Sequence, residues 1–175
     1  MDQLDQDAPT RAAIGVSDVV IVTIGANDLQ AALDRWHDRR CRPACPAPEL
    51  SGIEPGLARI LHGLRLLHPG RPAHILVTGY WNVFPDGTMG RAKYGPDYLA
   101  WSAGVTRRAN GEIAAAATAA GATYVDLYTP FKGSDGTTDP TDLLAADGDH
   151  PNQQGHDVIA ASLLTALPRR ALQDR

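Results

Sequence analysis

Asp147 and His150 are the residues whose spacing points most directly to chemistry. They lie three residues apart in Asp147-Gly-Asp-His150, just before Pro151, so one short turn can bring the carboxylate against the imidazole. A carboxylate that accepts the Nδ1 proton fixes the tautomer of the ring and leaves Nε2 free to take a proton from a nucleophile. The pair therefore has the composition of a general base with its orienting acid, and Asp149 is the alternative carboxylate.

Asn27 is the second candidate. It lies in Gly25-Ala-Asn-Asp28, directly after an apolar stretch. A side-chain amide aimed at a developing oxyanion stabilises the transition state of acyl transfer. Both motifs also have simpler explanations: Asn27 and Asp28 could open a helix, and an acidic residue before His150 could cap the last helix, with that histidine an ordinary loop residue. Neither motif decides the matter alone.

The elements around these residues indicate an α/β fold. Apolar, β-branched stretches at 18–24, 73–78 and 122–127 are typical of strands buried on both faces of a parallel sheet. Helical patterns cover 26–38, 55–67, 98–120 and 158–167. Strands that alternate with helices predict a three-layer α/β/α sandwich with right-handed crossovers.

The candidate residues all follow predicted strands. Residues 25–28 follow the first strand, 79–82 the second, and the long loop that ends at His150 follows the third. Open parallel sheets bind ligands beyond the carboxyl ends of their strands, so these segments are expected to meet at one edge. The loops at 80–97 and 128–150 are rich in Gly, Pro and Asp. In the first, Tyr80, Trp81 and Asn82 are candidates to line a substrate cleft, and a packed loop is the alternative.

Length and composition limit the classes of protein to consider. The chain has 175 residues, 43% of them hydrophobic, which suffices for one sizeable core but not for two ordinary domains. We expect one domain over 1–175, with irregular structure at 1–16 and 169–175. The net charge of −4 arises from scattered charges without a basic stripe, so we do not expect nucleic acid as a partner.

Export, membrane and metal signals are weak. No apolar stretch reaches the roughly 18 to 20 residues that span a bilayer, and the acidic start is unlike a signal peptide. We expect a soluble, cytoplasmic chain without a membrane span; an exported full-length parent is the alternative. Cys41 and Cys45 favour a surface disulfide or free thiols over a metal site, because no second pair of ligands follows. No calcium-loop or phosphate-loop spacing is present, so we expect no metal and no cofactor.

Taken together, the two motifs resemble signature blocks of the SGNH (GDSL-type) hydrolase family. Gly25-Ala-Asn-Asp28 resembles the Gly-x-Asn-Asp block, and Asp147-Gly-Asp-His150-Pro resembles the Asp-x-x-His-Pro block, in the same order over residues 15–167. The resemblance implies a flavodoxin-like sheet and a serine ester hydrolase, esterase- or lipase-like, that acts on a small-molecule ester. It implies that His150 is the base, Asp147 its orienting acid and Asn27 an oxyanion-hole donor.

The chain departs from that family in its first block. Members of the family resemble one another in a Gly-Asp-Ser block on the first strand, whose serine is the nucleophile, and in a later oxyanion-hole glycine; neither block is present. Gly133-Ser-Asp-Gly136 is the nearest imitation, but it lies late in the chain and in scrambled order. Only 17 residues precede Asp18, where the family has further strands. We therefore expect a truncated form that lacks the first two strands and the nucleophile.

Two consequences follow from that expectation. Loss of two strands would leave the strand at 18–24 as an exposed apolar edge, which favours self-association. It also leaves a rival hypothesis, that the chain is a non-catalytic remnant that serves as a binding or interaction domain. A site in which Asp and His bind a metal is the third and weakest alternative.

Overall fold

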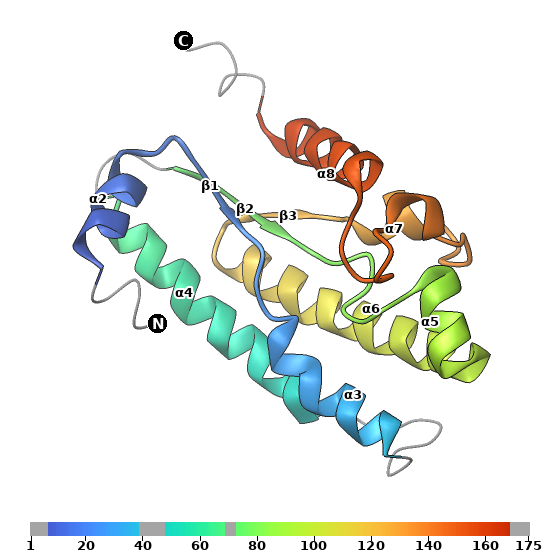
Figure 1. The fold of residues 1–175 in the computed structure, drawn as a ribbon. Helices are drawn as coiled ribbons and strands as arrows, with labels where there is room; N and C mark the ends of the chain where they lie inside the picture. Colours follow the sequence, from blue (N-terminus) through green and yellow to red (C-terminus); the bar gives the residue numbers. More distant parts are fainter. Residues whose placement is uncertain (1–6, 39–47, 69–72, 169–175) are drawn as a thin grey trace.

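The computed structural model describes residues 7–38, 48–68 and 73–168. It contains a small parallel sheet with helices on both of its faces (Figure 1). The elements in chain order are α2 (Ala8–Val16), β1 (Val19–Val22), η1 (Asn27–Leu29), α3 (Gln30–His37), η2 (Pro48–Gly52), α4 (Ile53–Leu66), β2 (His74–Thr78), α5 (Gly87–Tyr94), α6 (Pro96–Ala119), β3 (Thr123–Val125), α7 (Tyr128–Lys132), η3 (Thr141–Leu143) and α8 (Gln153–Ala166).

The sheet has the order β1-β2-β3, and all three strands run parallel. Val19 pairs with His74, and Leu76 pairs with Thr123, so the carboxyl ends of the strands lie at the same edge. The parallel sheet predicted from the apolar stretches is confirmed, and each strand lies within its predicted range. Among the described residues, β1 and β3 are the two edge strands.

Two helices cover one face of the sheet. α4 places Leu57, Leu61 and Leu64 at the spacing of successive helical turns, and all three are buried. They pack with Ile75 and Val77 of β2 and with the buried face of α6 in the main core. α4 and α6 therefore form one helical layer, as Figure 1 shows.

α8 covers the other face. Ile159 and Leu163 pack against Leu76 and Val125 of the sheet, in a smaller second core. The predicted three-layer arrangement is thus present over the described residues, as a three-stranded parallel sheet flanked by helices (Figure 1).

The start of α6 is set by an aromatic cluster. Trp101 stacks between Trp36 of α3 and Phe84 of the segment after β2, with ring centroids 4.9 and 5.3 Å away. Gly95, with φ of 87°, and Pro96 in the first turn allow the sharp change of direction from α5 into α6. The cluster joins the loops after β1 and β2 to α6.

Two sequence predictions about irregular regions were wrong. Residues 1–16 were expected to be irregular, but α2 forms because the Asp7 carboxylate accepts hydrogen bonds from the backbone and hydroxyl of Thr10 at its first turn. The predicted loops at 80–97 and 128–150 contain α5, α7 and η3, and α5 begins where the Asp86 carboxylate accepts from the N–H of Gly87. Short capped helices lack the long apolar period on which the prediction depended.

A third prediction, that the first strand is buried on both faces, was also wrong. Ile21 is 52% exposed, whereas Val20 and Val22 are half-buried against the main core. The reason is that β1 is an edge strand, and the second core beneath α8 includes Val19 of this strand but not Ile21. Cys41 and Cys45, for which a surface disulfide or free thiols were expected, lie outside the described residues, as does the segment 169–175. No helix in the described ranges is long and apolar enough to cross a membrane.

Candidate active site

Three segments gather at the carboxyl edge of the sheet. The turn with Asn27 follows β1, the segment from Gly79 to Asp86 follows β2, and α7 with the loop to His150 follows β3 (Figure 1). The parallel register places all three exits at one edge, as the sequence predicts. Ligand sites of open parallel sheets lie at this edge.

Asp147 and His150 are in direct contact. His150 Nδ1 lies 2.7 Å from Asp147 Oδ2. The other carboxylate oxygen, Oδ1, accepts hydrogen bonds from the backbone N–H groups of Asp149 at 2.9 Å and of His150 at 3.1 Å. The short turn expected from the three-residue spacing is therefore formed, and Asp147, rather than Asp149, orients the imidazole.

The loop around this pair is closed by backbone bonds. Ala145 N–H donates to the carbonyl of His150 at 2.8 Å, and Leu144 pairs with Pro151 as an antiparallel bridge. Asn152 caps α8, since its Oδ1 accepts from the N–H of Gly155 at 3.0 Å. The alternative explanation that an acidic residue before His150 caps this helix is therefore wrong.

The contact shifts the pKa of both groups. Bonds from the Asp149 backbone, the His150 ring and the His150 backbone lower the pKa of Asp147 to about 2. The hydrogen bond and the negative charge of Asp147, with a smaller effect of Asp149, raise the pKa of His150. The side chain of His150 is 76% exposed, and its Nε2 has no hydrogen-bond partner among the described residues. The ring is thus held at one nitrogen and open to solvent at the other, as a general base requires.

Asn27 lies at the start of η1 and is exposed. No side-chain hydrogen bond caps η1 or α3, so the helix-opening alternative gives the Asn27 side chain no capping bond. The turn itself is held by the N–H of Ala26, which donates to the hydroxyl of Tyr80 at 3.3 Å. The structure places Asn27 at the same sheet edge as His150. Its side-chain amide has no hydrogen bond to another described residue.

The three candidates to line a substrate cleft, Tyr80, Trp81 and Asn82, differ in their surroundings. Tyr80 is buried, and its backbone exchanges two hydrogen bonds with the side chain of Asn110. Trp81 is half-buried and stacks on Phe131 at 4.8 Å. Asn82 is buried, with its amide bonded to side chains of the protein. Contact of these three residues with a substrate stays a prediction, and Trp81 is the most accessible of them.

No serine is hydrogen-bonded to the candidate base among the described residues. All five serines belong to the described residues. Ser17, Ser51, Ser102 and Ser162 each donate their hydroxyl to a backbone carbonyl of their own segment. Ser134 is exposed in the turn after α7.

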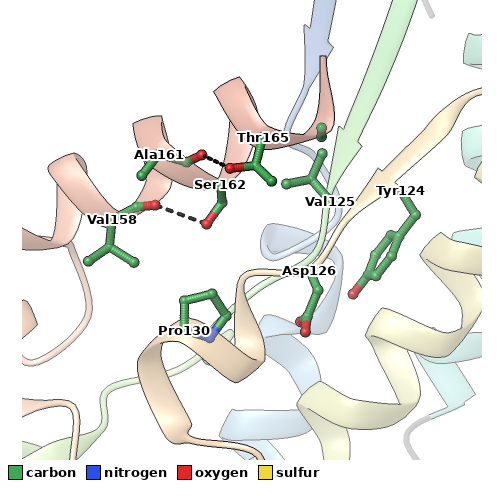
Figure 2. Close-up of a pocket in the computed structure, with 9 residues that line it drawn as sticks. Tyr124, Val125, Asp126, Pro130, Val158, Ala161, Ser162 and Thr165 are labelled. Carbon is green, nitrogen blue, oxygen red and sulfur yellow. Dashed lines mark hydrogen bonds between the residues drawn. The ribbon is translucent and has the colours of Figure 1, made fainter. Parts of the chain in front are cut away.

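Ser162 lines a hollow in the surface (Figure 2). The hollow has a volume of about 460 Å³ and lies between β3, α7 and α8, where Asp126 and Tyr124 also face it. Ser162 donates to the carbonyl of Val158 at 2.9 Å, and it lies ~13 Å along α8 from the first residue of that helix. No histidine is among the described residues that line this hollow, so Ser162 has no imidazole beside it.

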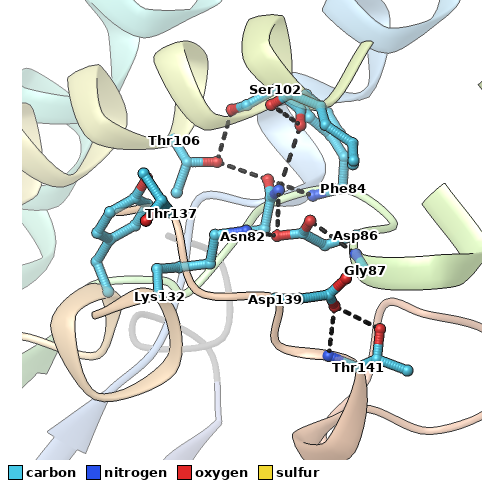
Figure 3. Close-up of polar contacts among 12 residues, drawn as sticks. Asn82, Phe84, Asp86, Gly87, Ser102, Thr106, Lys132, Thr137, Asp139 and Thr141 are labelled. Carbon is cyan, nitrogen blue, oxygen red and sulfur yellow. Dashed lines mark hydrogen bonds and ion pairs between the residues drawn. The ribbon is translucent and has the colours of Figure 1, made fainter. Parts of the chain in front are cut away.

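Sequence reasoning missed a buried polar network near the site. Asn82, Asp86, Lys132 and two α6 side chains form it (Figure 3). A signal was present in the sequence: Ser102, Thr106 and Asn110 repeat every four residues along the buried face of α6. Polar residues at the core positions of a helix indicate buried partners.

A second hollow adjoins the loop of the candidate base. It has a volume of about 300 Å³ and lies between α5 and the segment from Thr141 to Gly148. Its lining includes Met89, Ala92 and Leu144. Over residues 7–38, 48–68 and 73–168, no group of three or more His, Cys, Asp or Glu side chains is arranged to hold a metal ion.

Comparison with known proteins adds a family and related folds. The model of the GDSL-like lipase/acylhydrolase family matches residues 1–158. None of the curated proteins matches this chain.

Several solved structures have a similar fold. The lipase Lip_vut3 from goat rumen metagenome aligns with a TM-score of 0.63 and 16% identity, over 92% of this chain and 69% of that chain. Axe2, an acetylxylan esterase from Geobacillus stearothermophilus, aligns with a TM-score of 0.58 and 19% identity, over 94% and 64%. A lipase/acylhydrolase from Enterococcus faecalis aligns with a TM-score of 0.53 and 20% identity, over 94% and 66%. The chain therefore spans about two thirds of the length of these structures.

Proposed function

The chain belongs to the GDSL-like lipase/acylhydrolase family, and on that premise we propose that it provides the base, the orienting acid and an oxyanion donor of a serine ester hydrolase. One observation carries the proposal: Asp147 Oδ2 holds His150 Nδ1 at 2.7 Å while Nε2 stays open, at the carboxyl edge of a parallel sheet. The resemblance in sequence and the geometry of the loop support the same two residues.

The reaction is acyl transfer in two stages. A serine Oγ attacks the ester carbonyl carbon while its proton passes to His150 Nε2, and Asp147 stabilises the imidazolium that forms. The tetrahedral oxyanion accepts a hydrogen bond from the Asn27 amide. Collapse of this intermediate passes the proton to the alcohol that leaves. Water then attacks the acyl-serine by the same steps in reverse and releases the acid.

The nucleophile is proposed to lie on a strand that pairs with the open edge of β1. None of the five serines of this chain is bonded to His150, and β1 pairs on one side only within the described residues. In a flavodoxin-like sheet, a further strand beside β1 would bring its carboxyl end to the edge where Asn27 and His150 lie. Side chains of that strand on the same face would then lie beside the exposed Ile21.

Hydrolysis of p-nitrophenyl acetate tests this proposal in two arms. The chain as it stands is expected to show no turnover that depends on His150, and its rate should equal that of the His150→Ala variant. Turnover lost in His150→Ala would contradict the placement of the nucleophile outside these five serines. The second arm uses the chain extended by whatever strand and Gly-Asp-Ser segment the upstream DNA encodes in frame.

The extended chain is expected to gain turnover that His150→Ala and Asp147→Asn reduce. Removal of one triad member lowers kcat by a factor of about 10⁴ or more in serine hydrolases. An extended chain that hydrolyses no ester would overturn the enzymatic proposal.

A second candidate function is a non-catalytic interaction domain. The observation that favours it is the absence of a serine beside His150 among the described residues, together with the exposed apolar side chain of Ile21 on an edge strand. Under this alternative, no upstream Gly-Asp-Ser segment exists and substitution of His150 leaves binding of the partner unchanged.

A further inference from the structure

Asp86 and Lys132 form a buried ion pair behind the loop of the candidate base. Lys132 Nζ lies 2.6 Å from Asp86 Oδ2, and the two side chains are 9% (Lys132) and 2% (Asp86) exposed. Asp86 caps the start of α5, and Lys132 is the last residue of α7, so the pair joins the segments that follow β2 and β3 (Figure 3). The proton transfers of ester hydrolysis do not use this pair.

The Asp86 carboxylate is held at both of its oxygens. Oδ2 also accepts from Asn82 Nδ2 at 3.0 Å, and Oδ1 accepts from the N–H of Gly87 at 2.7 Å. Asn82 is fixed in turn by the hydroxyl of Thr106, which donates to its Oδ1 at 2.7 Å (Figure 3). Three donors therefore fix the position of the Asp86 carboxylate.

The backbone of Asp86 binds the loop that carries Asp147 and His150. The N–H of Asp86 donates to the carbonyl of Gly148 at 2.7 Å. Gly148 lies between Asp147 and Asp149 in the sequence. It is buried, and its φ is 73°. A Cβ at this position would lie 2.7 Å from Met89 Cβ and 3.0 Å from the carbonyl oxygen of Asp86. The turn that carries Asp147 and its partner therefore packs closely on the first turn of α5.

Burial of an ion pair costs free energy, because both charges are removed from water. Two apolar side chains of similar size would occupy the same space without removing charges from water, and a buried pair is weak evidence for stability. A charge-assisted hydrogen bond does fix direction as well as distance, which neutral packing does not. A general base needs such fixed geometry at its orienting carboxylate.

We propose that Asp86 and Lys132 are positioning residues, which keep Asp147 in contact with His150 through the bond from the Asp86 N–H to the Gly148 carbonyl. The inference rests on the proposed function only in taking His150 as the base. Its test is a titration of the ring and needs no ester turnover, so failure of the hydrolase proposal would leave the result of this test intact.

The test compares the pKa of His150 in the parent chain and in Lys132→Met by NMR of the ring Cε1–H groups, with the signal assigned through His150→Gln. Removal of a positive charge by itself raises the pKa of a nearby imidazole, because the imidazolium is then repelled less. Loss of the contact with Asp147 lowers it toward the ordinary value of about 6.5. The two effects have opposite signs, so the direction of the change separates them.

We expect a lower pKa of His150 in Lys132→Met. Lys93→Met is the matched control: it removes the other lysine, which is exposed on α5, and should leave the titration of His150 as in the parent chain. A folded Lys132→Met chain with an unchanged or higher pKa of His150 would overturn the proposal.

Lys132→Met leaves the Asp86 carboxylate buried without its cation and could fail to fold. The double variant Asp86→Asn, Lys132→Met removes both charges, leaves no unpaired buried charge and does not change the net charge. We expect it to fold with a lowered pKa of His150. The proposal is overturned if the double variant folds and titrates like the parent, and also if it fails to fold, since the pair would then be needed for the fold rather than for the loop.

Discussion

The hydroxyl of Tyr80 accepts a hydrogen bond from the backbone N–H of Ala26 across 3.3 Å, and this bond joins the segment after β2 to the turn that carries Asn27. Burial raises the pKa of Tyr80, so the hydroxyl stays neutral at ordinary pH. The backbone of the same residue is fixed by Asn110 of α6. Tyr80 thus places the oxyanion candidate relative to the sheet.

Tyr80→Phe is expected to lower the free energy of unfolding by about 1 kcal/mol, because the N–H of Ala26 loses its partner at a half-buried site. Urea unfolding measures this, and faster amide hydrogen exchange at Ala26 should accompany it. Tyr128→Phe is the control: its hydroxyl accepts from Arg107 at an exposed site, and its removal should change stability by less than about 0.5 kcal/mol. Equal losses in the two variants would show that the Ala26 bond has no special importance.

Asp147→Asn is expected to lower the pKa of His150, because the hydrogen bond and negative charge of Asp147 are the main causes of its raised value. NMR titration of the ring measures the change. Asp142→Asn, which removes an equal charge from an exposed position in η3 without a contact to the ring, should leave the titration unchanged. A His150 ring that titrates identically in Asp147→Asn would contradict the contact.

The same pair makes stability depend on pH. The pKa of His150 is raised on folding, so its contribution is complete below its unfolded value of about 6.5 and is lost as the pH rises through the folded value. The pKa of Asp147 falls to about 2 on folding, so its contribution is complete above its unfolded value of about 3.9 and is lost as the pH falls toward 2. The two contributions overlap between about pH 4 and pH 6.5.

The free energy of unfolding of the parent chain should therefore exceed that of Asp147→Asn most at about pH 5. The difference should shrink, but not vanish, at about pH 8, where the backbone bonds to Asp147 remain. Both side chains are more than half exposed, so we expect the part due to the ring to be below about 1 kcal/mol. Denaturant unfolding at the two pH values measures it. A difference that grows with rising pH would contradict a raised pKa of His150 in the folded chain.

Long-period features were the predictable part of the fold. The helices α4 and α6 follow from apolar patterns at helical spacing that extend over ten residues or more. The parallel direction of the strands follows from the alternation of strands with helices. α2, α5 and α7 were missed because helices of five to nine residues depend on one capping carboxylate or glycine more than on a period. The edge position of β1 was expected from the resemblance to the hydrolase family and not from its composition, since an apolar β-branched run has the same appearance in a central strand.

The candidate site also has a part that the sequence could predict and a part that it could not. The contact of Asp147 with His150 was predictable, because both residues lie in one turn and local spacing decides their distance. The ion pair of Asp86 with Lys132 was not, because 46 residues separate its partners and only the packing of α5, α6 and α7 brings them together. The polar repeat on α6 indicated that a buried network exists but not which charges complete it.

Leu61→Ala tests the core that supports the sheet. Leu61 is fully buried on α4, so its truncation should leave a cavity and lower the free energy of unfolding by about 2–5 kcal/mol. Leu66 lies on the same helix and is 66% exposed, and Leu66→Ala should cost less than about 0.5 kcal/mol. Urea unfolding of both variants measures the contrast. Similar losses at the two positions would mean that α4 does not face the sheet as described.

Ile21→Lys tests the open edge of β1. Ile21 is 52% exposed on an edge strand, and apolar edge strands favour pairing with a second chain. A lysine there keeps its charge in water while its stem lies along the sheet, so we expect a small change in stability and weaker self-association. Sedimentation velocity over a range of concentrations should show association in the parent chain that the variant loses.

Val20→Lys is the control. The side chain of Val20 packs against the main core, so a lysine there should destabilise the fold, because its charge would have to enter that core. A parent chain that sediments as a monomer at every concentration would contradict the expectation that the β1 edge pairs with a second chain.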